Sequence, residues 1–367
     1  MDPTTKYLSL EQPDKSSHLW KYTPWNRVHP TGKLDSIPQM GTPKMSISSI
    51  DGTHPPDGIR LIEGIMAETD SEISDELTYS FLDASSKNSK WTLKIEEGFT
   101  SQLPILLNIE AEGKFDVVHI GLDVGFRANF ELVTKVVGEC EWFGILRTGH
   151  IGDGAILNDV LMGLQEEGAM LRSDSITLGR DAHVRAGTVS SGSERTKADL
   201  RYRLSSPGGS VRVLGSILSA DSMHLDHHIE IHHEAPETFS RLSWHSACGG
   251  KSRTVGTGML RVKEGSKGAD AAQIFHNLLL SNGAEADSIP ELEVMESDVV
   301  GCGHGTANGP IDEEQEFYLQ ARGFDKQDAR RALIAAFLNS TLSEMGGVSL
   351  HEWLVGALAK ELESLDS

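Results

Sequence analysis

Two clusters of side chains have the types and the spacing of metal ligands. Cys302 and His304 are separated by one glycine, so an extended segment places the thiol and the imidazole on the same face of a strand. His228, Glu230 and His232 alternate in the same way inside a histidine-rich stretch. Thiolate, imidazole and carboxylate are ligands of zinc, iron and related metals. The first pair could therefore contact a metal or sulfide, and the second set could form a two-histidine, one-carboxylate site.

Each cluster also has a purely structural interpretation. A free cysteine is more often a small buried apolar residue than a reactive one, and we expect Cys140 and Cys248 to be of this kind. The histidines could equally form a stacked row along one face of a sheet, hydrogen-bonded to neighbouring strands. Both interpretations of both clusters stay open on spacing alone.

Composition excludes several classes of function. The chain has 54 acidic and 33 basic residues, a formal charge of −21, which repels nucleic acids and anionic membranes. It contains no run of about eighteen apolar residues and no phosphate-binding loop, dinucleotide fingerprint or nucleophile elbow. Three scattered cysteines do not make a disulfide framework. We expect a cytoplasmic protein that does not hydrolyse nucleotides by itself.

The elements that position the two clusters follow from the turn pattern. Residues 1–60 are rich in Pro, Ser, Thr and Asp around an aromatic island at 20–25, which predicts an N-terminal arm or cap. Residues 61–309 consist of short apolar stretches broken by similar turns at 152–155, 166–169 and 179–182. Two such units give a period near 27, within the range of solenoids, so we predict a mainly β fold with a parallel β-helix core. An antiparallel sandwich is the alternative.

Residues 310–367 have the signals of a small α-helical domain. Asp312 precedes an acidic first turn, Gly323 ends that helix, and Asp325 is placed to cap a longer one. Ser349, with Glu352 three positions later, predicts a capping box for a last helix.

Several ordered blocks resemble the SufB/SufD family of scaffold proteins in the SUF system of iron-sulfur cluster assembly. The match is most specific in two blocks, one from 232 to 281 and one from 290 to 323; the second contains Cys-Gly-His-Gly-Thr at 302–306 and Phe-Tyr-Leu at 317–319. The other matching segments of these blocks lie at 232–240, 256–258, 270–273, 277–281, 290–293, 312–314 and 321–323. SufB-type chains carry a glutamate after the histidine that matches His304, and a sulfur-accepting cysteine upstream. Here Gly305 follows, and no cysteine lies between Cys248 and Cys302, so the chain looks most like SufD.

The resemblance implies a scaffold and not an enzyme. A SufC-type ATPase, where ATP hydrolysis is expected, would dock on the helical domain at Phe317, Tyr318, Arg322 and Gly323. A SufB-type paralogue or a second copy would pair along the β-helix, and a transient iron-sulfur cluster would form there beside His304 and Cys302. Two rival hypotheses are a self-sufficient metalloenzyme using His228, Glu230 and His232, and a solenoid that only organises partners.

Overall fold

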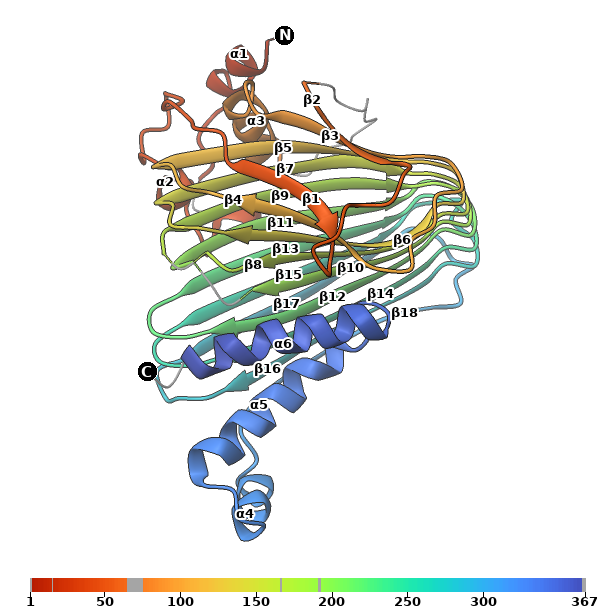
Figure 1. Ribbon diagram of the computed structural model, residues 1–367. Helices are drawn as coiled ribbons and strands as arrows, with labels where there is room; N and C mark the ends of the chain where they lie inside the picture. The colour runs from red at the N-terminus through yellow and green to blue at the C-terminus, as the bar shows by residue number, and fades with distance from the viewer. Residues whose placement is uncertain (1, 15, 65–74, 166, 191–192, 365–367) are drawn as a thin grey trace.

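Two stacked, nine-stranded sheets wind into a parallel β-solenoid (Figure 1). The computed structural model describes residues 2–14, 16–64, 75–165, 167–190 and 193–364. From β3 onward, successive strands alternate between the sheets, and every pairing is parallel except β1 with β4 and β2 with β3 at one end. The predicted β-helix is therefore confirmed, and the antiparallel sandwich is wrong.

The helix-covered sheet contains, in spatial order, β1 (Lys44–Ser49), β4 (Ile105–Glu110), β6 (Asn129–Val137), β8 (Ile156–Gly163), β10 (His183–Ser190), β12 (Ser210–Ser219), β14 (Phe239–Cys248), β16 (Asp270–Leu279) and β18 (Gly301–Pro310). The arm-covered sheet contains β2 (Ile59–Glu63), β3 (Lys90–Ile95), β5 (Phe115–Val124), β7 (Trp142–Ile151), β9 (Ala169–Leu178), β11 (Arg195–Leu204), β13 (His224–His233), β15 (Arg253–Val262) and β17 (Glu285–Val294).

The coil length agrees with the predicted period near 27 and then grows. Glu131 and Asn158, stacked on adjacent coils, are 27 residues apart, whereas Asn277 and Asn308 near the far end are 31 apart. The predicted turns stack at the coil edges: the Ala155 and Ala182 amides donate to the carbonyls three residues earlier, at 3.1 and 3.3 Å. The predicted turn at 166–169 begins at Glu166, which lies outside the described residues.

One layer of the largely apolar interior is charged. Arg147, only 1% exposed, pairs with Asp159 and lies 3.5 Å from Asp174. Arg172 binds Asp174 through two nitrogens, at 3.0 and 2.6 Å, and donates to the Thr188 hydroxyl at 3.0 Å. Two arginines and two aspartates thus form a neutral quartet between the sheets, consistent with the rule that buried charges are paired.

The N-terminal segment is attached to the solenoid by aromatic side chains, as the island at 20–25 predicted. It contains α1 (Pro3–Leu8), the 3-10 turn η1 (His18–Trp20) and α2 (Trp25–Val28), and it packs on α3 (Glu76–Ser85). The Trp25 ring centroid lies 5.3 Å from those of Trp20 and Phe81, and Phe81 lies 5.9 Å from Trp142 of β7. This cluster covers part of the outer face of the arm-covered sheet.

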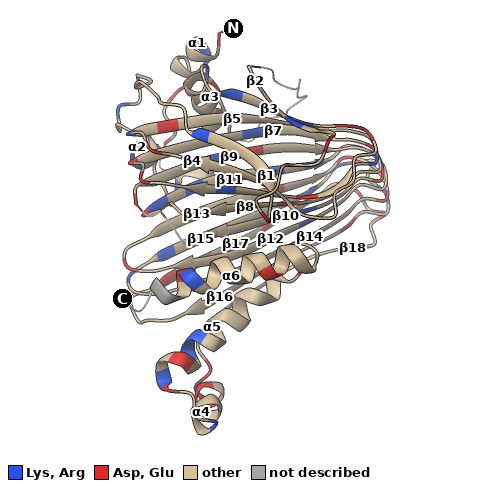
Figure 2. Cartoon of the chain, in the orientation of Figure 1, with Lys and Arg blue, Asp and Glu red and all other residues tan. Residues whose placement is uncertain are grey.

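The C-terminal helices are α4 (Glu313–Ala321), α5 (Lys326–Leu342) and α6 (Val348–Ser364). Asp325 caps α5 as predicted, Asp312 caps α4, and Gly323 has the left-handed φ of +100° that ends α4. α5 and α6 share a buried core with the outer face of the helix-covered sheet, whereas α4 projects from the solenoid and has no buried residue (Figure 1). In Figure 2 charged residues mark α4 and the start of α5, the rest of α5 has none, and α6 carries a few.

The predicted capping box of the last helix is wrong. α6 begins at Val348, so Ser349 lies inside its first turn. The Gly347 amide instead donates to the Glu131 carboxylate of β6 at 2.6 Å, and the His351 amide closes the first helical turn on the Gly347 carbonyl. A carboxylate from the sheet therefore satisfies a donor at this helix start, which local sequence cannot reveal. No helix within the described ranges is long and apolar enough to cross a membrane.

Candidate functional site at the open end of the solenoid

The solenoid ends in two strands that each have one neighbour only. β17 closes the arm-covered sheet and β18 closes the helix-covered sheet. Cys302 of β18 packs against the interior core, so its alternate neighbours His304, Thr306 and Asn308 also face inward. Cys302 is half-buried and His304 is exposed. The predicted pairing of thiol and imidazole on one strand face is thus observed, at the rim of the interior.

The outward positions of β18 carry almost no side chains. Gly301, Gly303, Gly305 and Gly309 occupy them together with Ala307, and a methyl group added at any of the four glycines would meet no atom within 4 Å. In a sequence, a run of glycines in a strand usually indicates tight backbone packing. The structure gives the opposite reason: these glycines lie on an open face.

Three amide side chains bridge the two sheets behind this rim. Gln273 donates to the Glu291 carbonyl at 2.8 Å, and Asn277 donates to the Ser288 hydroxyl and the Asn308 side chain, both at 2.8 Å. Gln273 is fully buried, and its Oε1 has no hydrogen-bond partner among the described residues. These amides fix the spacing between β17 and the strands β16 and β18.

Sequence reasoning did not select the three amides as site residues. Gln273 appeared in it only as part of a matching block. Their inward positions on the last coils were the available signal, because a polar side chain that faces a solenoid interior needs a partner across it.

Burial raises the pKa of the Cys302 thiol, and the negative charge of Asp270 raises it further. The thiol is therefore mainly protonated at neutral pH and would have to lose its proton to bind a metal. His304, on the exposed rim, is paired in register with Gln273 of β16. The arrangement places one imidazole and one thiol at the open end of the solenoid.

The histidine row lies elsewhere, on the outer face of β13. His228, Glu230 and His232 share one face as predicted: Glu230 lies 3.6 Å from His228 Nε2 and 3.0 Å from His232 Nε2. All three side chains are buried. His228 also contacts Asp199 at 2.8 Å, and Arg201 of β11 donates to Glu230 at 2.9 Å.

The row therefore belongs to an ion-pair network. Burial alone would raise the pKa of Glu230, but the hydrogen bond from His232 and the charges of His228 and Arg201 outweigh it and hold that pKa at about 2. A metal ion at Glu230 would have to compete with the Arg201 guanidinium. Among the described residues, no group of three or more His, Cys, Asp and Glu side chains could hold a metal ion.

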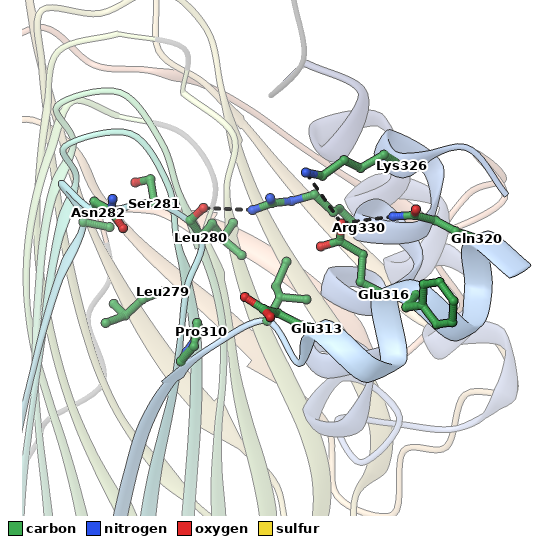
Figure 3. Close-up of a pocket in the computed structure, with 13 residues that line it drawn as sticks. Leu279, Leu280, Ser281, Asn282, Pro310, Glu313, Glu316, Gln320, Lys326 and Arg330 are labelled. Carbon is green, nitrogen blue, oxygen red and sulfur yellow. Dashed lines mark hydrogen bonds and ion pairs between the residues drawn. The ribbon is translucent and has the colours of Figure 1, made fainter.

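A cleft lies between α4 and the solenoid, close to the predicted docking residues of the helical segment (Figure 3). Phe317 and Tyr318 are 73% and 55% exposed, and the Arg322 guanidinium lies 4.7 Å from the Tyr318 ring centre. The cleft has a volume of about 710 Å³. On its walls, Glu316 accepts from Gln320 at 3.1 Å and Arg330 donates to the Leu280 carbonyl at 2.9 Å. Of the four predicted residues, Phe317 lines the cleft.

Comparison with known proteins gives one family. Residues 109–337 match the model of the SUF system FeS cluster assembly SufBD core domain. An iron-sulfur cluster assembly SufBD family protein of Mycobacterium leprae is 34% identical over 197 residues, which cover 52% of this chain and 50% of that protein. One from Mycobacterium tuberculosis is 26% identical over 381 residues, covering 98% of this chain and 91% of the relative.

The iron-sulfur cluster assembly protein SufD of Escherichia coli is 34% identical over 112 residues, which cover 30% of this chain and 26% of that protein. The family match spans more than half of the chain, including the last coils with Cys302 and His304. The chain belongs to the SufBD family of iron-sulfur cluster assembly proteins of the SUF system.

Proposed function

We propose that this protein is a SufD-like scaffold component of a SUF assembly complex. In this proposal its open solenoid end pairs with a SufB-type protein or with a second copy. Residues 310–367 form the docking domain for a SufC-type ATPase. The single observation that carries the proposal is the pair Cys302 and His304 on the rim of an unpaired solenoid end, in a chain of this family.

The edges of β17 and β18 suit pairing with another chain. An unpaired strand edge presents free backbone donors and acceptors, and natural proteins usually protect such edges. Here the outward face of β18 is bare, and Val294 of β17 and Val300 before β18 are 41% and 74% exposed. A matching solenoid end could add its strands to both sheets and bury these apolar side chains.

The iron-sulfur cluster is the cargo of this interface. His304 would supply a neutral imidazole nitrogen as a ligand or as a proton acceptor, because its side chain reaches the exposed rim. Cys302 would assist as a second ligand after losing its proton, or would only pack against the interior core. No turnover is assigned to this chain; ATP hydrolysis would occur in the SufC-type partner.

The exposed α4 is the proposed docking element for that ATPase. Phe317 and Tyr318 on α4, with Arg322 and Gly323 directly after it, would form the contact surface. α5 continues from this surface onto the helix-covered sheet, so a displacement of α4 would be transmitted to the last coils through one helix. Nucleotide-driven movement of the partner could then shift the paired solenoids between two arrangements. The three free cysteines support a reducing, cytoplasmic setting.

The test is anaerobic co-expression with candidate SufB-type and SufC-type proteins, followed by affinity capture and analysis of iron and sulfide. We expect the wild-type chain to capture both partners and His304→Ala to lose bound iron and sulfide while keeping both partners. Thr306→Ala is the matched control, since Thr306 is also exposed and inward-facing on β18. A wild-type chain that captures neither partner refutes the scaffold assignment, and equal cluster content in His304→Ala refutes only the role of His304.

A second variant separates the two partner surfaces. The double variant Phe317→Ala, Tyr318→Ala should abolish capture of the ATPase. It should leave pairing with the SufB-type protein intact, because α4 is not part of the strand edges of β17 and β18 that would form that pairing surface. Loss of both partners in this variant would contradict the assignment of separate surfaces.

A further inference from the structure

Three arginines are stacked on the part of the helix-covered sheet that α5 and α6 leave open. Arg185 of β10 is in register with Arg212 of β12, and Arg212 is in register with Arg241 of β14. Adjacent strands are about 4.8 Å apart. We call these three residues the arginine ladder. Like charges directly opposite one another destabilise a sheet unless neighbouring carboxylates offset them.

Two rungs of the ladder are fixed in place by neighbours. The Phe239 ring lies 5.4 Å from the Arg212 guanidinium and 4.2 Å from that of Arg241. Arg241 also binds Asp270 at 2.8 Å, and Arg212 lies 3.4 Å from the carboxylate of Glu344 in the turn between α5 and α6. These contacts restrict the side chains, which lowers the entropy lost when a ligand binds.

Arg185 is different from the other two. It is exposed, and it makes no hydrogen bond or ion pair with any residue that the structure describes. The nearest carboxylate in the same cross-strand row, that of Glu131, already accepts hydrogen bonds from Asn158 at 2.7 Å and from the Gly347 amide at 2.6 Å. The charge of Arg185 is therefore available to a ligand.

A hollow lies at the free end of the ladder. Its volume is about 330 Å³, and its polar walls are the side chains of Asn158, His183, Arg185, Ser210 and Arg212, with no carboxylate among the lining residues. Ile156, which is 44% exposed, adds an apolar wall. Hydrogen-bond donors and positive charge thus converge at one place on a chain whose net charge is −21.

We propose that the arginine ladder is a docking surface for an acidic helix of a partner protein. Carboxylates at positions i and i+4 of a helix lie about 5–6 Å apart, close to the spacing of the rungs, so one helix could pair with successive arginines. The ladder runs over three strands, with Arg185 exposed and Arg212 and Arg241 partly exposed, which suits an elongated ligand. Because the net negative charge of the rest of the chain repels acidic proteins, the arginine ladder would also set the orientation in which an acidic partner binds.

This surface is independent of the two surfaces proposed above. It uses neither β17 and β18 nor α4, so loss of binding here would leave pairing at the open end and docking at α4 unchanged. The acidic helix would approach beside the turn between α5 and α6, where Glu344 would have to release Arg212.

The test uses a fluorescein-labelled helical alanine-based peptide with glutamates at i, i+4 and i+8, titrated with the full chain at low salt. We expect saturable binding that Arg185→Glu weakens at least about tenfold, since a favourable charge pair becomes a repulsive one. Arg180→Glu is the matched control, because Arg180 is exposed in the turn before β10 and the change in net charge is identical. A peptide with lysines in place of the glutamates should bind Arg185→Glu better than the wild type.

Three outcomes would overturn the proposal. In the first, the peptide does not bind to the wild-type chain. In the second, Arg180→Glu and Arg185→Glu weaken peptide binding equally. In the third, inorganic phosphate at an equal concentration displaces the peptide. The last result would assign the hollow to a small anion. Circular dichroism of each variant checks folding, and the exposure of both arginines makes a folding defect unexpected.

Discussion

The charged quartet in the solenoid interior gives the sharpest prediction for stability. Asp159→Asn keeps the shape of the side chain but leaves Arg147 with only the carboxylate of Asp174, 3.5 Å away and already bound by Arg172 through two nitrogens. The quartet then carries a net charge of +1 between the sheets. Removing one partner of a buried ion pair costs about 3–5 kcal/mol, and we expect a loss of this size.

Arg147 cannot avoid this cost by losing its proton. Burial would lower its pKa, but the carboxylates of Asp159 and Asp174 outweigh that effect and raise it. Even with one carboxylate removed, an arginine stays protonated near neutral pH. The whole penalty therefore appears in the free energy of unfolding, measured by urea denaturation followed by far-UV circular dichroism.

Two further variants make the measurement decisive. Glu96→Gln removes one partner of the exposed pair Arg60–Glu96, whose atoms are 2.6 Å apart, and surface pairs contribute only about 0.2–1 kcal/mol. Arg147→Met with Asp159→Leu replaces both charges by apolar groups and should recover most of the stability lost in Asp159→Asn, because the Arg172–Asp174 pair stays intact. If Asp159→Asn costs no more than Glu96→Gln, the argument from an uncompensated buried charge is refuted.

Three other predictions concern different parts of the molecule. Gly215→Ala should destabilise the chain by about 1–3 kcal/mol in a urea titration, because the added methyl group would overlap the buried Trp244 ring. As a control, Gly303→Ala should change the free energy of unfolding by less than about 0.5 kcal/mol, because its added methyl group meets no atom. Trp25→Ala should release the N-terminal segment, because Trp25 is 2% exposed and packs between two aromatic rings. The release should appear as faster tryptic cleavage after Arg27 and Lys33. An unchanged cleavage rate would contradict the role of the aromatic cluster. Burial lowers the pKa of His227 to about 3, below the usual 6.5. As the pH drops, the imidazole is therefore protonated in the unfolded chain before it is protonated in the folded one. The free energy of unfolding should fall between about pH 6.5 and pH 3, by about 1.4 kcal/mol per pH unit for this residue. His227→Leu should reduce that slope between pH 6 and pH 4 in urea titrations, and an unchanged slope would exclude His227 as its source.

Much of the solenoid was predictable because its determinants are local. Each turn such as 152–155 positions a buried alanine at a coil edge, and the turns recur at the coil length. Alternation within a strand also placed Cys302 beside His304, and His228 beside Glu230 and His232, on common faces. Strand periodicity is sufficient for such statements.

The contacts between distant segments were not predictable in this way. The start of α6 depends on Glu131, more than two hundred residues earlier in the chain, and the histidine row depends on Arg201 of the preceding coil. The neighbouring strands decide whether a polar side chain finds a hydrogen-bond partner or faces solvent at the rim. That information lies in the register of the coils, and a single sequence gives the register only to within a few residues.

The bare outward face of β18 has a thermodynamic consequence for the last coil. A solenoid is stabilised repeat by repeat through contacts with neighbours, and the coil formed by β17 and β18 has a neighbour on one side only. Glycine loses more backbone entropy on folding than any other residue, and β18 has four. This coil should open first in native-state hydrogen exchange, and any chain that binds it would slow that exchange by mass action. If a second solenoid pairs with this end as proposed, ordering of the final coil and binding of that solenoid are one coupled equilibrium.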